Sequence, residues 1–92
     1  MRIDWAPSAL AVRKNISEWI EQDRELATAN RIARTIYNAI QPLRTMPYRG
    51  RPGRLENTRE LVLPRLPYLV IYQVLEDRAT ILNIVHGAQR WP

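Results

Sequence analysis

Residues 58–92 read TRELVLPRLPYLVIYQVLEDRATILNIVHGAQRWP, and they contain three segments typical of β-strands. The segments 60–63, 68–74 and 79–85 are rich in the β-branched and aromatic residues that strands favour. Only a few residues separate each segment from the next, and such short connections usually join neighbouring antiparallel strands. We therefore expect the last third of the chain to form an antiparallel sheet.

The first half of the chain shows the periodicity of two amphipathic helices. Apolar residues recur at intervals of mostly three and four from 9 to 20, which predicts a helix with its first turn at 7–8 and its end near 22, and they recur again between 26 and 43. Pro42 coincides with the end of the second pattern, because proline cannot donate the helical hydrogen bond. With a short strand at 2–5, the predicted order is β-α-α-β-β-β. This order indicates an α+β fold in which a helical hairpin packs on one face of an antiparallel sheet.

Length and composition limit the possible classes of protein. A chain of 92 residues, 46% of them apolar, has enough apolar surface for one modest core, so we expect a single domain spanning 1–92. Cysteine is absent from the sequence, which excludes a disulfide framework, and apolar runs such as 69–71 are far too short to cross a membrane. We expect a cytoplasmic protein that binds no metal and no cofactor.

Positive charge is concentrated in residues 44–65. Six arginines and two glutamates lie there, so this segment carries four of the five net positive charges of the chain. Arginine supplies thirteen of the fourteen basic residues, and its guanidinium group binds phosphate or carboxylate at two points. The bias reflects either GC-rich coding or an anionic partner, which would be nucleic acid or an acidic protein segment. Prolines and glycines within 44–57 predict a turn-rich loop without regular structure.

Four motifs follow one another along the chain in a recognisable order: GRPGR at 50–54, TREL at 58–61, PYLVIY at 67–72 and VHGAQRWP at 85–92. Together with the order of elements, they make the whole chain resemble the RelE/ParE superfamily of toxins from bacterial type II toxin-antitoxin modules. The resemblance implies a compact toxin that a cognate antitoxin holds inactive in a hetero-oligomer. It also implies one of two targets, since RelE-type toxins cut mRNA on the ribosome and ParE-type toxins inhibit DNA gyrase.

The end of the chain favours the ParE-like alternative. RelE-type nucleases commonly carry a sheet face rich in lysine and arginine and a tyrosine in a C-terminal extension, whereas this chain has a single lysine, Lys14, and no tyrosine after Tyr72. The ending His-Gly-Ala, followed closely by arginine and tryptophan, is similar to that of ParE-like members. We therefore favour gyrase inhibition within a plasmid stabilisation or addiction module. The alternatives are a ribosome-dependent mRNA endonuclease, which would make the protein an enzyme, and a small basic nucleic-acid-binding module without toxicity.

The candidate site residues depend on which alternative holds. For an endonuclease, a metal-free reaction needs a proton acceptor and cations around the phosphate, and the candidates are His86, Arg59, Arg65 and Arg90. For target binding by a gyrase inhibitor, the candidates are Arg51, Arg54, Arg59, Arg90 and Trp91. His86 and Trp91 also have ordinary structural explanations, in which the imidazole bonds a backbone carbonyl and the indole closes the core. Tyr68 and Tyr72 would either stack on bases or pack the core.

Two further expectations concern orientation and the antitoxin. Neighbouring strand residues point to opposite faces, so Arg59 should not pair with Glu60, and we expect Arg59 on the face away from the helices. The residues expected to bind the antitoxin are Leu10, Ile32, Tyr37, Arg49 and Arg51. The first three widen the apolar arc of the helices, and the arginines would attract an acidic segment. Equally, the wide arc could serve a helix packed between the sheet and the first helix.

Overall fold

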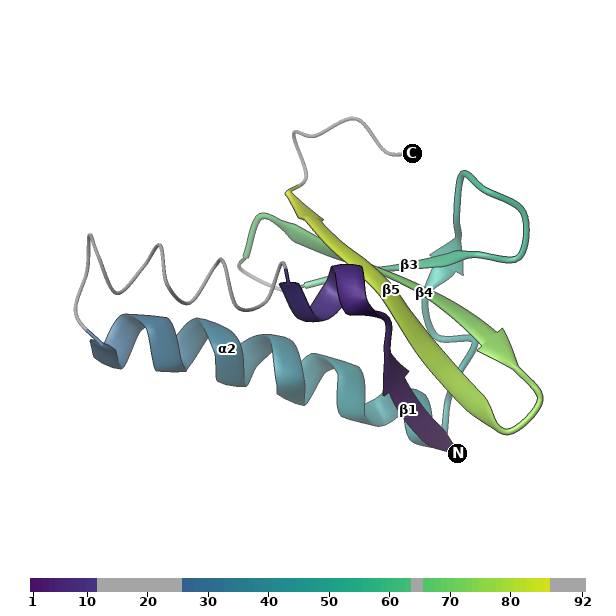
Figure 1. Cartoon of the computed structure of the whole chain (residues 1–92), viewed down its shortest axis with the longest axis horizontal. Coiled ribbons are helices and arrows are strands. Elements are labelled where there is room, and N and C mark those ends of the chain that lie inside the picture. Colours follow the sequence, from purple (N-terminus) through teal and green to yellow (C-terminus); the bar gives the residue numbers. More distant parts are fainter. Residues whose placement is uncertain (12–25, 64–65, 87–92) are drawn as a thin grey trace.

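The computed structural model describes residues 1–11, 26–63 and 66–86, and it shows one long helix beside a five-stranded sheet (Figure 1). The side chains of 26–30 are outside this description. The elements are β1 (Arg2–Trp5), α2 (Leu26–Ile40), the 3-10 helix η1 (Gln41–Arg44), β2 (Arg51–Pro52), β3 (Arg59–Val62), β4 (Tyr68–Leu75) and β5 (Arg78–His86). The α+β class predicted from the sequence is confirmed.

The strands lie in the order β1-β5-β4-β3-β2. The pairs β3–β4 and β4–β5 are antiparallel, as the short connections between them predicted. β1 instead pairs parallel to β5, with Arg2 opposite Arg78 and Trp5 opposite Ile81, so the sheet is mixed rather than wholly antiparallel. The argument from short connections does not apply to β1, because the helical region and three other strands separate it from β5 in the sequence.

Helix α2 ends where proline requires it to end. It stops at Ile40, and Pro42 lies in the first turn of η1, where a missing N–H group costs little. The first predicted helix begins as expected, since residues 7–11 are helical, but its remaining residues up to 22 lie outside the described part. Ser8 fixes this helical turn to the sheet, because its Oγ donates a hydrogen bond of 2.7 Å to the carbonyl of Leu82.

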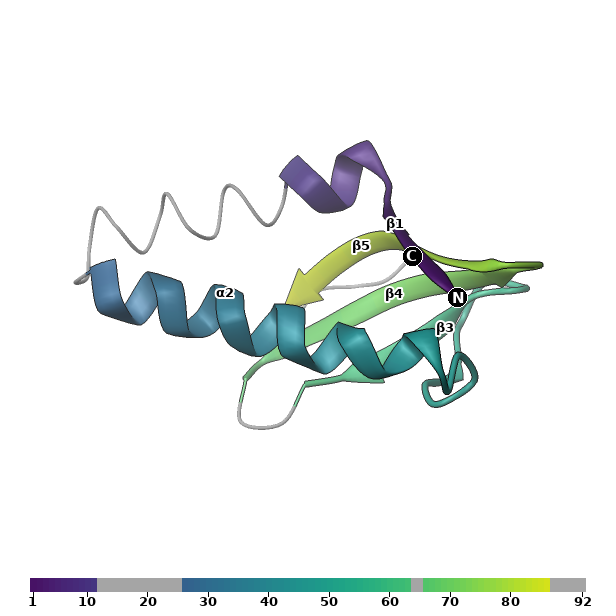
Figure 2. The ribbon, with the colours of Figure 1, turned by 90° about the horizontal axis from the view of Figure 1, so that it is seen from below.

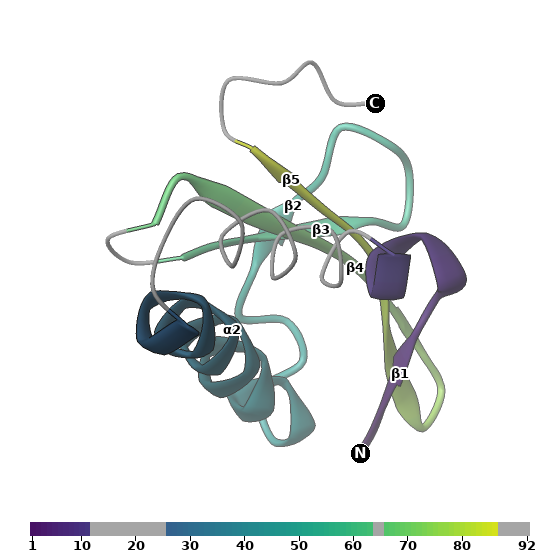
Figure 3. The same ribbon diagram turned by 60° about the vertical axis from the view of Figure 1, so that its left-hand side comes forward.

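The core lies between the helices and one face of the sheet. In Figure 2 and Figure 3, α2 forms a layer of its own beside the strands. The buried residues that pack together there are Ala9, Ile36, Ile40, Leu43, Leu61, Leu63, Val70, Tyr72, Ala79, Ile81 and Ile84. The predicted apolar stripe between 26 and 43 is confirmed for three residues that are buried in the core, Ile36 and Ile40 on α2 and Leu43 in η1. Tyr72 is completely buried in this cluster, so of its two predicted roles it takes the structural one.

One prediction for the loop was wrong. Residues 44–57 were expected to hold no regular element, yet Arg51 and Pro52 form the short strand β2, opposite Glu60 and Arg59 of β3. β2 is the outermost strand of the sheet, and an edge strand tolerates proline because one side of it needs no hydrogen-bond donor. Within the described residues, no helix is both long and apolar enough to cross a membrane.

Candidate functional site

The loop before β2 is fastened to the sheet by one buried hydroxyl group. The Oη of Tyr72 donates to the carbonyl of Pro47 over 2.7 Å and accepts the N–H of Gly50 over 2.8 Å. Burial raises the pKa of Tyr72, while the Gly50 hydrogen bond and the charge of Arg59 act in the opposite direction. A side chain at position 50 would collide with this arrangement, because an added Cβ would lie 2.7 Å from that Oη. The approach of the loop to the sheet therefore requires glycine there.

Arg59 holds the same loop from the neighbouring strand. Its Nη1 donates to the carbonyl of Gly50 over 2.6 Å and to that of Tyr48 over 3.2 Å. The guanidinium carbon also lies 4.9 Å from the centre of the Tyr48 ring, which is the geometry of a cation–π contact. Arg59 stands opposite Tyr72 in the ladder and therefore shares its face, the face that carries the helices. The expectation that Arg59 points away from the helices was wrong, because the loop folds back over this end of the sheet and supplies the carbonyl groups.

On the opposite face of the sheet, Arg51 forms an ion pair with Glu60. Both Nε and Nη2 of Arg51 contact the same oxygen, Oε1, at 3.0 and 2.9 Å. The Glu60 side chain is only 3% exposed, whereas that of Arg51 is 58% exposed. The second carboxylate oxygen, Oε2, is buried and has no hydrogen-bond partner among residues 1–11, 26–63 and 66–86. Arg51 therefore neutralises a buried charge and still presents much of its side chain at the surface.

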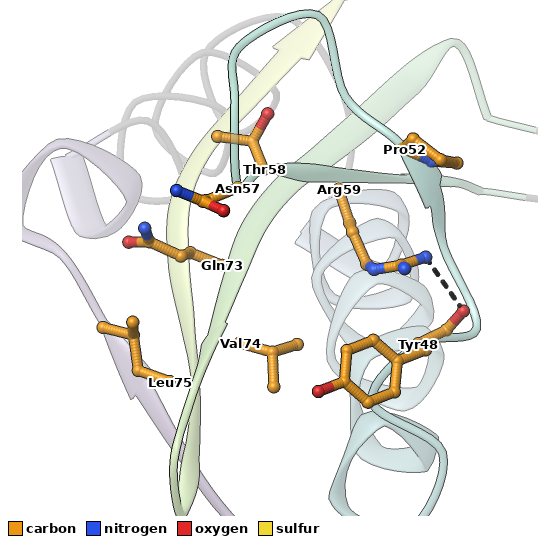
Figure 4. Close-up of a pocket in the computed structure, with 8 residues that line it drawn as sticks. All are labelled: Tyr48, Pro52, Asn57, Thr58, Arg59, Gln73, Val74 and Leu75. Atoms are coloured by element: carbon orange, nitrogen blue, oxygen red, sulfur yellow. Dashed lines mark hydrogen bonds between the residues drawn. The ribbon is translucent and has the colours of Figure 1, made fainter.

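A cleft opens where β3 begins. The last residue pair between β3 and β4 joins Arg59 to Tyr72, but β4 and β5 continue together as far as Leu75. Asn57, with a φ of 64°, lies in the turn that precedes β3 and takes the chain out of the plane of the ladder. The resulting cleft, of about 530 Å³, is drawn in Figure 4 and is lined by Tyr48, Pro52, Asn57, Thr58, Arg59, Gln73, Val74 and Leu75.

The candidate catalytic residues do not gather at this cleft. His86 is exposed at the end of β5, where its ring packs edge to face on Tyr68 with 5.9 Å between the ring centres. Arg59 is opposite Tyr72, four residues further along β4, which is a distance of about 13 Å along a strand. The guanidinium group of Arg59 binds the carbonyls of Tyr48 and Gly50. His86 and Arg59 are therefore not brought together. Arg65 and Arg90 lie outside the described residues.

The residues predicted to bind the antitoxin occupy three environments. Leu10 and Tyr37 are exposed, at 42% and 51%, as an interaction surface requires. Ile32 is only partly exposed and packs against the core. Arg49 is exposed in the loop, next to the Gly50 that Tyr72 holds. Their role in binding remains a prediction.

The remaining target-binding candidates divide between the turn and the end of the chain. Arg54 is exposed in the turn between β2 and β3. This turn is closed by a hydrogen bond of 2.7 Å from the Gly53 N–H to the Thr58 carbonyl. Arg90 and Trp91 lie outside the described residues.

Sequence reasoning missed the contacts that organise this region. Tyr48, Tyr72 and Glu60 hold or line the loop, but the partners they bind lie 9 to 25 positions away along the chain. The close spacing of Gly50 and Gly53 between arginines was a visible signal, since glycine often marks a close backbone approach. That signal did not reveal which side chain approaches.

Comparison with known proteins gives consistent results. The family model described as "ParE toxin of type II toxin-antitoxin system, parDE" matches residues 3–91. A relative from Sinorhizobium fredii (strain NBRC 101917 / NGR234), named "Putative toxin Y4kP", is 42% identical over 91 residues, which is 99% of this chain and 93% of the relative. A solved structure, "Chromosomal ParDE TA system from P. aeruginosa", has a similar fold, with a TM-score of 0.86 at 24% identity. The match covers 94% of this chain and 95% of that one.

Proposed function

We propose that this chain, which belongs to the ParE toxin family of parDE type II toxin-antitoxin systems, acts by inhibiting DNA gyrase. Membership of the family makes it the toxin of such a system and implies an antitoxin as its partner. In this proposal the toxin works in the cytoplasm, and its module stabilises the replicon that carries it. The observation that carries the proposal is the family match over nearly the whole chain, because gyrase inhibition is what the resemblance to ParE-type toxins implies.

The arrangement of the candidate catalytic groups also supports an inhibitor rather than a nuclease. General acid–base cleavage of RNA needs the proton acceptor and the phosphate-binding cations within hydrogen-bond reach of one phosphate. His86 and Arg59 lie about 13 Å apart along the strand direction, and the Arg59 Nη1 is engaged by two backbone carbonyls. Arg59 is thus better suited to holding the loop than to stabilising a pentacovalent phosphate.

We assign the contact with the target to the arginine-rich side of the molecule. Arg51 and Arg54 are exposed there, in and after β2, and Arg90 and Trp91 complete the proposed set. Arg59 contributes indirectly, because it fixes the loop that precedes Arg51. Guanidinium groups held on a short strand and its turn can bind carboxylates of a protein target at two points.

The test compares two activities of purified toxin. Supercoiling by DNA gyrase should be inhibited, and ribosomes programmed with mRNA should yield no toxin-dependent cleavage. Arg54→Ala should weaken inhibition several-fold without changing the folded state, and His86→Ala should inhibit as the wild type does. Ribosome-dependent cleavage that His86→Ala abolishes, with gyrase unaffected, would show that the protein is an endonuclease instead.

A further inference from the structure

The cleft beside β4 exposes backbone groups at an open sheet edge. The Leu63 N–H donates to the Tyr68 carbonyl, so Tyr68 directs its backbone groups towards β3. Along an antiparallel strand, the backbone groups of successive residues point alternately to the two neighbouring strands. The backbone groups of every second residue of β4 from Tyr68 to Val74 therefore point towards the β3 side. Val74 has its ladder partner, Ala79, on β5 and none on β3, because β3 begins at Arg59, opposite Tyr72. The N–H and the carbonyl of Val74 are consequently directed into the cleft.

The side chains around this edge favour an extended and acidic ligand. Both hydrogen bonds that Arg59 makes within the described part of the chain use Nη1, so its Nε and Nη2 make none there. The Tyr48 ring beneath the guanidinium is 65% exposed, and Leu75 at the far end of the cleft is 41% exposed. Residues 44–65 carry six arginines against two glutamates, which attracts carboxylates and repels a second copy of this chain. A strand with alternating apolar and acidic residues would suit all of these groups.

We propose that the cleft receives an extended acidic segment of the antitoxin, which adds to the sheet as a strand beside Gln73–Leu75 and places a carboxylate on Arg59. A helix could not use this edge, since its own backbone groups are already bonded internally, whereas a strand offers a donor and an acceptor to the Val74 backbone groups that face the cleft. The inference rests on the antitoxin partner that the family implies, and it is independent of whether gyrase is the target.

Two valine-to-proline substitutions test the strand directly. Val74→Pro removes the N–H that faces the cleft but none of the hydrogen bonds to β5, so the fold should persist. Val62→Pro is the matched control. Val62 lies next to Leu63 and so faces away from β4, at the other open edge, where β2 pairs only with Arg59 and Glu60. Titration calorimetry with the purified antitoxin should show roughly 10- to 100-fold weaker binding for Val74→Pro and less than about 3-fold for Val62→Pro.

Amide hydrogen exchange of the unmodified toxin gives a second readout that needs no variant. The Val74 amide should exchange quickly in the free toxin and at least ten times more slowly in the toxin-antitoxin complex. Unchanged exchange at Val74, or a loss of affinity in Val62→Pro alone, would overturn the proposal. If Val74→Pro does not fold, the exchange result alone decides. Inhibition of gyrase by the free toxin is measured separately, so failure of the proposed target leaves this result unaffected.

Discussion

The hydroxyl group of Tyr72 should contribute a large share of the stability of this small domain. Replacing Tyr72 with phenylalanine keeps the buried ring but removes the donor to the Pro47 carbonyl and the acceptor of the Gly50 N–H. Gly50 is buried, so its N–H would lose its partner without gaining water. Each lost hydrogen bond costs about 1 kcal/mol and a buried group left unpaired costs about 1–3 kcal/mol, so we expect a loss of about 2–4 kcal/mol in the free energy of unfolding.

The assay is chemical denaturation followed by circular dichroism, supported by thermal unfolding. For a domain of about this size, 1 kcal/mol corresponds to about 4–8 °C, so the melting temperature should fall by at least about 8 °C. Tyr68→Phe is the matched control, because Tyr68 lies on the same face of β4 and its hydroxyl makes no hydrogen bond within the described residues. Its cost should stay below about 0.5 kcal/mol. Equal stability of the two variants would refute the view that the Tyr72 hydroxyl fastens the loop.

The remaining predictions concern the same region. Burial raises the pKa of Tyr72 above its ordinary value of 10.0, so the unfolded state loses this proton first as the pH rises. The free energy of unfolding of the wild type should therefore fall above about pH 10, and that of Tyr72→Phe should fall less steeply. Denaturation at about pH 8 to 11 measures both. Arg51→Ala should lower the free energy of unfolding by about 1–3 kcal/mol, because it leaves the Glu60 carboxylate buried and unpaired. Most of this loss should disappear when Glu60 is also replaced by glutamine. The control is Arg49→Ala, at an exposed loop position, which should change stability by less than about 0.5 kcal/mol. Gly50→Ala should destabilise by about 1–3 kcal/mol, since its Cβ would meet the Tyr72 Oη and the Glu60 carbonyl, and thermal unfolding of the purified variant checks this.

Local sequence patterns predicted the elements well, because they depend on neighbouring residues alone. The β-rich runs became β3, β4 and β5 with ends within one residue of the prediction, and Pro42 marked the end of α2. The parallel pairing of β1 was missed, since it joins segments more than seventy residues apart in the sequence. Local composition contains no information about which edge of a sheet a distant strand will join.

The orientation of Arg59 failed for a related reason. Alternation along β3 correctly separated Arg59 from Glu60, but it could not say which of them faces the helices. The answer depends on Leu61, which enters the core and thereby places Arg59, two positions earlier, on the same face. The surprising result is that a charged residue occupies the core side at all. It does so at the beginning of the strand, where the loop supplies carbonyl groups in place of water.

The loop connects the two sides of the sheet, and this has a consequence for how the toxin can be neutralised. On the helix side, Tyr72 and Arg59 hold the backbone at Pro47, Tyr48 and Gly50. Immediately afterwards, Arg51 crosses to the other face and pairs with Glu60. An antitoxin strand that binds Arg59 in the cleft would therefore act on the segment that presents Arg51, the proposed target contact, without having to cover it. Inhibition of the toxin by such a segment would work through the position of the loop as well as through direct competition.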